Sequence, residues 1–200
     1  MNYSTPENLI LLCGELVSDG ACLYTDEGED FFEFTMKVVL PTGTDLLKIV
    51  IGNSLIDETI KQGAVISVTG RLMEEERSFE GGIDSVIKVF VTEVYCGETE
   101  ITSGVFLTGN VIRKPYSYDF QDGERAEFQI AVGAGEKPLC VPVSATGENV
   151  ATAKTLGLGD VVSVLGQLHS FEYLDLNDAG SVTKTAYEVE ILTFTALPKI

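Results

Sequence analysis

The sequence has no tryptophan, one histidine and only four cysteines among its 200 residues. The cysteines form no Cys-x-x-Cys pair, which argues against a zinc site. The single histidine, His169, has no serine or cysteine at a spacing typical of nucleophilic catalysis. We therefore predict a protein that is not an enzyme and that uses no metal and no cofactor.

Long apolar runs are also absent. No run reaches the roughly 18 residues that a membrane-spanning helix needs. The first eight residues lack the basic start and the apolar segment of a secretory signal. We expect a cytoplasmic protein with no membrane partner.

Cations are scarce throughout the chain. Lysines and arginines number 13 against 31 aspartates and glutamates, which gives a net charge of −18. Residues 1–102 have a net charge of −13, whereas residues 103–200 have a net charge of −5. Nucleic-acid-binding proteins normally display a basic surface. Nucleic-acid binding by this chain would therefore have to rely on local groups of cations. Residues 103–200 are the more favourable half, because they are the less acidic.

The two halves of the chain repeat one another. Three pairs of similar segments follow in the same order at an offset of 94 to 96 residues. The pairs are Leu12–Leu16 with Leu107–Val111, Glu33–Val38 with Glu127–Val132, and Gly63–Leu72 with Gly159–Leu168. We predict two domains, residues 1–102 (copy one) and residues 103–200 (copy two).

Each copy is predicted to hold five strands and one short helix. Alternation of apolar and polar residues indicates the strands, and Gly63 and Gly157 mark the ends of the helices. The expected strands are 9–17, 32–40, 46–51, 65–73 and 85–94, then 104–112, 126–132, 139–143, 161–170 and 182–192. The expected helices are 54–61 and 148–155. This order predicts an all-β protein of two tandem five-stranded OB-fold barrels, each with a short helix between its third and fourth strands.

The alternation also predicts which side chains are buried. The expected core residues are Phe34, Val38, Ile66, Val68, Phe128, Ile130, Val162 and Val164. The first strand of each copy is apolar on both faces, with Leu9, Leu11 and Phe106 among its residues. Such a strand is typically covered, so we expect barrel–barrel pairing through these strands, within one chain or in a homo-oligomer.

Several motifs of copy one resemble the bacterial single-stranded-DNA-binding protein family. Leu23–Gly28 followed by Glu33–Val39 is similar to the first hairpin of that family. Ile49–Leu55, Lys61–Leu72 and Val91–Val94 are similar to its third, fourth and fifth strands. The resemblance implies OB folds that bind single-stranded DNA in replication, recombination or repair. The family places base-stacking aromatics in strand three, where this chain has Leu46, Leu47 and Ile51, and in the loop after strand four, where it has Phe79 and Tyr173.

Binding of single strands needs cations along the backbone path and aromatic rings for the bases. In copy two these residue types are interleaved in the first loop and follow the fourth strand: Arg113, Lys114, Tyr116, Tyr118 and Phe120, then Phe171 and Tyr173. Copy one offers Lys37, Lys48, Arg71 and Phe79, beside loops rich in carboxylates. Ordinary surface charge and loop packing are the alternatives for these side chains. We predict that copy two makes most of the contact with single-stranded DNA.

Two functions are therefore open. The first is a single-stranded-DNA-binding protein that acts by electrostatics in a groove and by base stacking. The second is an OB-fold module that has lost nucleic-acid binding and contacts proteins through its acidic surface.

Overall fold

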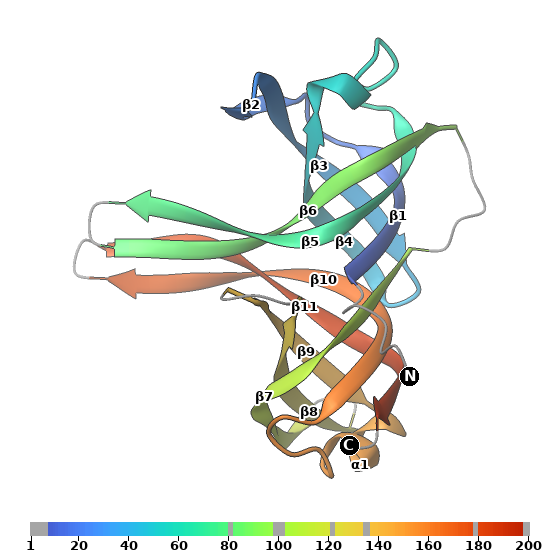
Figure 1. Ribbon diagram of the computed structural model, residues 1–200, viewed down its shortest axis with the longest axis vertical. Coiled ribbons are helices and arrows are strands. Elements are labelled where there is room, and N and C mark those ends of the chain that lie inside the picture. Colours follow the sequence, from blue (N-terminus) through green and yellow to red (C-terminus); the bar gives the residue numbers. More distant parts are fainter. Residues whose placement is uncertain are drawn as a thin grey trace. The chain divides into compact units, whose positions relative to one another are not determined.

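Strands make up most of the chain (Figure 1). The computed structural model describes residues 8–79, 82–97, 103–120, 123–133, 137–177 and 180–197. In copy one the strands are β1 (Asn8–Leu16), β2 (Ala21–Asp26), β3 (Glu29–Leu40), β4 (Gly43–Gly52), β5 (Val65–Phe79) and β6 (Gly82–Cys96). In copy two they are β7 (Gly104–Phe120), β8 (Gly123–Val132), β9 (Leu139–Thr146), β10 (Val161–Asn177) and β11 (Gly180–Leu197).

The strands of copy one pair in a closed order. β1 is antiparallel to both β3 and β5, β3 pairs with β4, and β5 pairs with β6. β4 and β6 run parallel, with Ile49 opposite Val89, so the pairings return to their starting strand. The additional strand β2 extends the sheet from β3. A sheet that closes in this way has an inside, which its apolar residues fill, and an outward face.

The strands of copy two pair in the equivalent order. β7 is antiparallel to β8 and β10, and β8 is antiparallel to β9. β9 and β11 run parallel, with Val143 opposite Val189, and β10 neighbours β11. The repeat in the sequence therefore reappears as a repeat in strand pairing.

The predicted core is confirmed. All eight expected core residues are buried, none with more than 3% of its surface exposed. In β3, for example, Phe34, Met36 and Val38 are buried at every second position, while Lys37 and Val39 at alternate positions are exposed. The outward face therefore carries the odd-numbered residues of this strand.

The chain divides into two compact units. One contains the described residues of Ile10–Ser103 and Ser170–Ala186, and the other contains the described residues of Met1–Leu9, Gly104–His169 and Tyr187–Ile200. The end of the β10–β11 hairpin is thus grouped with copy one. The predicted division at residues 102 and 103 stays a prediction.

The predicted helix at residues 54–61 is wrong. A single 3-10 turn, η1 (Asn53–Leu55), stands there instead. The Ser54 backbone N–H and hydroxyl both donate to Glu29, and the Asp57 carboxylate accepts from the Thr59 N–H at 2.8 Å. These side chains satisfy the local backbone groups and so compete with the helix.

The equivalent segment of copy two does form a helix, α1 (Asn149–Ala153), which is shorter than expected. Three hairpins differ in the opposite direction, because β5, β7 and β10 continue well past their predicted ends. Backbone hydrogen bonds extend these hairpins beyond the core, where the sequence need not alternate between apolar and polar residues. No helix within the described ranges is long and apolar enough to cross a membrane.

Candidate nucleic-acid interface

The first hairpin of copy two carries the predicted cations in an irregular stretch of strand. The pairing of β7 with β8 shifts register between Val111 and Arg113 and again between Arg113 and Tyr116. Pro115 lies in the second bulge and has no N–H to give to the ladder. Bulges redirect side chains, and Arg113 and Lys114 are both exposed here.

The aromatic residues follow directly along the same strand. Tyr116 and Tyr118 have ring centroids 5.9 Å apart at an interplanar angle of 27°, and Phe120 meets Tyr118 edge-on at 6.3 Å. Tyr116 is 66% exposed and Phe120 is 52% exposed. The three predicted rings therefore form one row, and two of them present surface to solvent.

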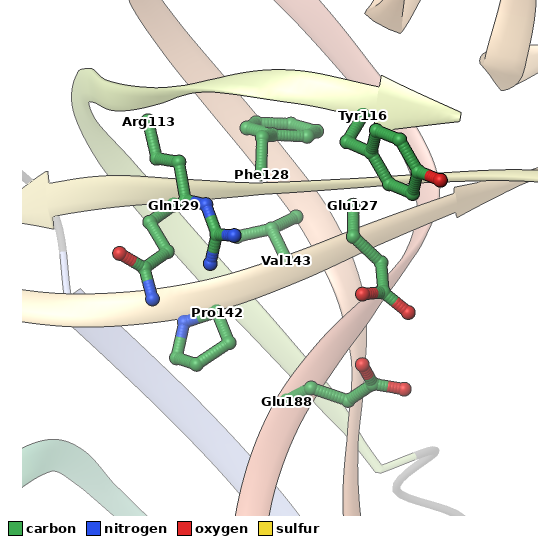
Figure 2. A pocket seen from close by; sticks show the side chains of 8 residues that line it. All are labelled: Arg113, Tyr116, Glu127, Phe128, Gln129, Pro142, Val143 and Glu188. Carbon is green, nitrogen blue, oxygen red and sulfur yellow. The ribbon is translucent and has the colours of Figure 1, made fainter. Parts of the chain in front are cut away.

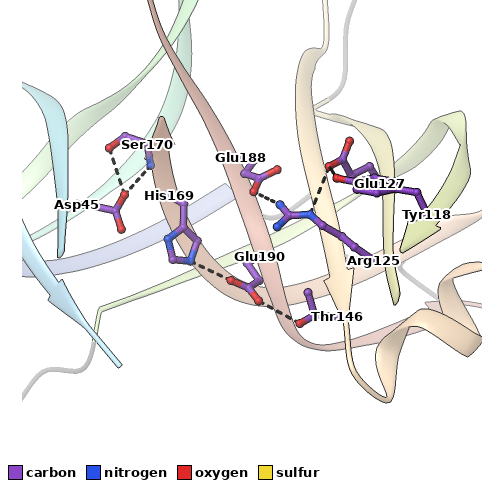
Figure 3. Close-up of polar contacts among 9 residues, drawn as sticks. All are labelled: Asp45, Tyr118, Arg125, Glu127, Thr146, His169, Ser170, Glu188 and Glu190. Carbon is purple, nitrogen blue, oxygen red and sulfur yellow. Dashed lines mark hydrogen bonds and ion pairs between the residues drawn. The ribbon is translucent and has the colours of Figure 1, made fainter. Parts of the chain in front are cut away.

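Arg125 on β8 joins this row and was not foreseen from the sequence. Its guanidinium lies 5.9 Å from the Phe120 ring centroid. It donates to Glu188 and lies 3.3 Å from the Glu127 carboxylate, which also accepts from the Tyr118 hydroxyl (Figure 3). Burial acts to lower the pKa of Arg125, but the bond to Glu188 raises it overall. The bond to Glu127 raises the pKa of Tyr118.

A small pocket of about 90 Å³ lies beside this network. Pro142 and Val143 contribute apolar surface, while Arg113 and Tyr116 come from the hairpin. The Glu127 and Glu188 side chains point toward one another in the pocket (Figure 2). Two carboxylates thus line the same pocket as Arg113, one of the predicted DNA-binding cations.

A second polar cluster lies on the outward face of copy two. His169 Nε2 is 3.3 Å from Glu190, and the Thr146 hydroxyl donates to the same carboxylate at 3.0 Å (Figure 3). Glu127, Glu188 and Glu190 therefore outnumber Arg125 on this face. The exposed Arg113 and Lys114 provide the additional positive charge.

In copy one the predicted cations lie on the outward face of β3, β4 and β5. Lys37 is exposed, and Lys48 donates to the Thr35 hydroxyl at 2.8 Å. The Arg71 guanidinium lies 5.4 Å from the centroid of the Phe90 ring. Phe79 ends β5, but its side chain lies outside the described residues.

A buried lysine anchors the carboxylates of this face. Lys88 on β6 is only 3% exposed, donates to Glu33, and lies 2.7 Å from Glu75. Lys48 lies 3.4 Å from the same Glu33 carboxylate. Burial acts to raise the pKa of Glu33, but the bonds and charges of Lys88 and Lys48 lower it overall. The cluster is close to neutral because two cations meet two anions.

Three aromatic rings of copy one also form a row. Tyr24 on β2 stacks on Phe31 of β3 with centroids 4.9 Å apart, and Phe31 meets Phe90 of β6 at 5.5 Å. Phe31 and Phe90 were not foreseen as site residues. In β6 the neighbours Val89 and Val91 are buried, so alternation places Phe90 on the outward face.

Phe171 and Tyr173, the other two predicted rings of copy two, lie in a separate segment of the chain. Both are exposed on β10, in the segment that belongs to the compact unit of copy one. At the base of that segment, the Ser170 N–H and hydroxyl donate to Asp45 of β4 at 2.8 and 3.2 Å. Within the described part of the chain, no group of three His, Cys, Asp or Glu residues is arranged to hold a metal.

Two structures of one bacterial protein are similar to this chain along almost its whole length. The wild-type single-stranded DNA binding protein from Thermus aquaticus superposes with a TM-score of 0.78 at 20% identity, covering 98% of this chain and 95% of its own. A deletion mutant of that protein gives a TM-score of 0.78 at 19% identity, covering 99% and 98%. No protein-family model and no curated protein sequence matches the chain. The predicted resemblance to bacterial single-stranded-DNA-binding proteins is therefore confirmed at the level of the fold.

Proposed function

We propose that this protein binds single-stranded DNA without catalysis, in replication, recombination or repair. The observation that carries the proposal is the likeness to a single-stranded DNA binding protein over 99% of the chain. The exposed rings and cations of the first copy-two hairpin support it, because single strands are held by stacking and by cations along the backbone.

The two closed strand orders support a chain of two five-stranded OB-fold barrels, divided near residues 102 and 103. In each copy the outward face of the second and third barrel strands and the flanking hairpins would form the binding groove. We further propose barrel pairing through β1 and β7, within the chain or in a homo-oligomer. Leu9 is exposed, while Leu11 and Phe106 are half-buried, so apolar surface remains on these strands.

Charge sets the strength of the proposed binding. Lys88 and Arg125 are already held by carboxylates, so they add little net positive charge to their faces. Arg113 and Lys114 are exposed, in the copy whose net charge is the less negative, and Glu127 and Glu188 line the same pocket as Arg113. Binding should then be weak, with a Kd near the micromolar range of non-specific complexes, and should weaken steeply with salt.

A second candidate is a protein-interaction module that has lost DNA binding. The specific observation in its favour is the excess of carboxylates on the outward face of copy two, where Glu127 and Glu188 contact Arg125 and Glu190 lies beside His169. A polyanion would meet repulsion there, whereas a basic protein segment would not.

Charge reversal in each copy tests the proposal and the expected role of copy two. Arg113→Glu with Lys114→Glu should abolish binding of fluorescent oligo-dT, measured by anisotropy at low salt. Lys37→Glu with Arg71→Glu makes the same charge change in copy one and should weaken binding less. A larger loss from the copy-one pair would contradict the assignment to copy two. Absence of binding by the wild-type protein would favour the interaction module.

A further inference from the structure

We infer that copy one has its own base-stacking site, a ladder of Tyr24, Phe31 and Phe90 that ends at Arg71. The inference rests on the proposed function and names the groups of copy one that would meet the bases. It differs from the resemblance, which places stacking aromatics in strand three and in the loop after strand four. The corresponding strand here, β4, presents the exposed Leu46 and no aromatic ring.

The ladder crosses the outward face from one side to the other. Tyr24 lies directly opposite Phe31 in the β2–β3 pairing, and Arg71 lies directly opposite Phe90 in the β5–β6 pairing. The centroid separations of 4.9 and 5.5 Å, and the 5.4 Å from the guanidinium to the Phe90 ring, are within the range of favourable ring contacts. Residues from four strands thus make one continuous row.

The sheet leaves space for this row. Gly52 on β4 stands opposite Phe31. A Cβ at residue 52 would collide with the Glu29 carboxylate and approach the Phe31 ring to 3.3 Å. The missing side chain therefore lets the Phe31 ring lie across β4, between the rings from β2 and β6.

The two ends of the ladder are the surfaces available to a ligand. Tyr24 is 39% exposed and Arg71 is exposed, whereas Phe31 and Phe90 between them are half-buried. Burial and the nearby Glu75 carboxylate raise the pKa of Tyr24, so its ring stays a neutral phenol at physiological pH. A neutral ring and a planar guanidinium both stack on nucleobases of any sequence.

The carboxylates beside the ladder determine which part of a nucleotide it accepts. Glu33 and Glu75 are held on this face by Lys88, and Glu75 acts electrostatically on Tyr24. They would repel a phosphate but not an uncharged base. Copy one should therefore contact bases, with the phosphates directed away from the face.

A comparison of normal and abasic oligomers tests this site. Tyr24→Leu removes an exposed ring, and Tyr24→Phe keeps the ring without the hydroxyl. Tyr95→Leu is the matched control, because Tyr95 is 46% exposed on β6 and is not part of the ladder. Each variant is titrated with fluorescent oligo-dT and with an abasic deoxyribose-phosphate oligomer of equal length, after circular dichroism has confirmed its fold.

We expect Tyr24→Leu to weaken oligo-dT binding about fivefold or more, the loss of one stacked base, and to leave abasic binding unchanged. Tyr24→Phe and Tyr95→Leu should bind oligo-dT like the wild type. Wild-type affinity in Tyr24→Leu, or an equal loss for both oligomers, would overturn the stacking site while the proposed function stands. If the wild-type protein binds no oligo-dT, the proposed function falls and the inference falls with it.

Discussion

At the scale of single residues, the two copies pair one equivalent glutamate with different cations. Glu33 in copy one and Glu127 in copy two occupy equivalent places in the repeat. Glu33 is paired with Lys88 on β6, whereas Glu127 is paired with Arg125 on its own strand, β8. Val89 of β6 and Val189 of β11 occupy equivalent places in the parallel strand pairs of the two copies. The residue before each valine is Lys88 in copy one and Glu188 in copy two, so copy two has a carboxylate where copy one has the lysine. Sequence matching could not reveal this exchange, because the partners come from different strands.

Residue 27 has a backbone conformation that does not suit its side chain. Glu27 has φ = 48° and precedes Gly28 at φ = 86°, in the tight turn between the paired Asp26 and Glu29. A left-handed conformation costs an ordinary L-residue roughly 1–2 kcal/mol, and asparagine tolerates it best after glycine. We expect Glu27→Asn to raise the free energy of unfolding by about 0.5–1 kcal/mol in urea titrations.

A charge-matched control separates backbone strain from charge. Glu58→Asn removes the same charge from an exposed turn in which the backbone is not left-handed. Its stability should stay within about 0.5 kcal/mol of the wild type. An equal gain in both variants would show that relief of acidic repulsion, and not the turn, is responsible.

At the scale of elements, strands were predictable where a core enforces alternation. The eight core residues were found because their positions repeat every two residues beside polar neighbours. The ends of β5, β7 and β10 were not found, because polar hairpins extend there without an apolar face. The segment 54–61 has a helix-like start, yet Ser54 and Asp57 bond elsewhere and leave a 3-10 turn. Short elements depend on such individual bonds, which a pattern of residue types does not specify.

The same limit applies to the candidate site. Arg113, Lys114 and the aromatics of the first copy-two hairpin could be selected from their composition and spacing. Arg125, Phe31 and Phe90 could not, because their roles come from neighbours across the sheet. Likewise, nothing in the sequence indicated that Phe171 would be grouped with copy one.

Close strand contacts in both copies require glycine at one repeated position. Gly70 on β5 and Gly166 on β10 are equivalent in the repeat, and an added Cβ would collide with the carbonyl oxygen of Phe90 or Glu190, respectively. We expect Gly166→Ala to lower the free energy of unfolding by about 2 kcal/mol, because a backbone atom cannot give way as a side chain can.

Gly104→Ala provides the control for this prediction. A Cβ at residue 104 would come no nearer than 3.8 Å to its neighbour, the Gly166 carbonyl oxygen. Gly104→Ala should therefore change stability by less than about 0.5 kcal/mol. Equal effects of the two alanines in chemical denaturation would show that the strands have room to move apart at Gly166.

At the scale of the whole molecule, acid relieves the repulsion of a net charge of −18 while it removes individual ion pairs. The ion pair of Glu33 can be isolated by comparison with Lys88→Met. The lowered pKa of Glu33 means that its contribution is present above the unfolded pKa, near 4.5, and is lost as pH falls through the folded pKa. The stability advantage of the wild type over Lys88→Met should therefore shrink between about pH 5 and pH 3.

Urea titrations of the wild type and Lys88→Met at each pH give the difference in their free energies of unfolding. The relief of acidic repulsion affects both proteins alike, so it largely cancels in this difference. Lys61→Met is the control, because Lys61 is an exposed lysine in a turn region. Its difference from the wild type should change little over the same pH range. A wild-type advantage over Lys88→Met that stays constant or grows toward pH 3 would contradict the role given to Lys88.

The central claim is that this acidic chain binds single-stranded DNA through local cations and rings. The most direct measurement is the anisotropy of fluorescent oligo-dT, compared with a duplex of equal length, at low and at moderate salt. We predict binding of the single strand near the micromolar range at low salt, a steep loss of affinity as salt rises, and weaker binding of the duplex, whose bases cannot stack on the protein. No binding of oligo-dT at low salt, or equal affinity for the duplex, would contradict the account.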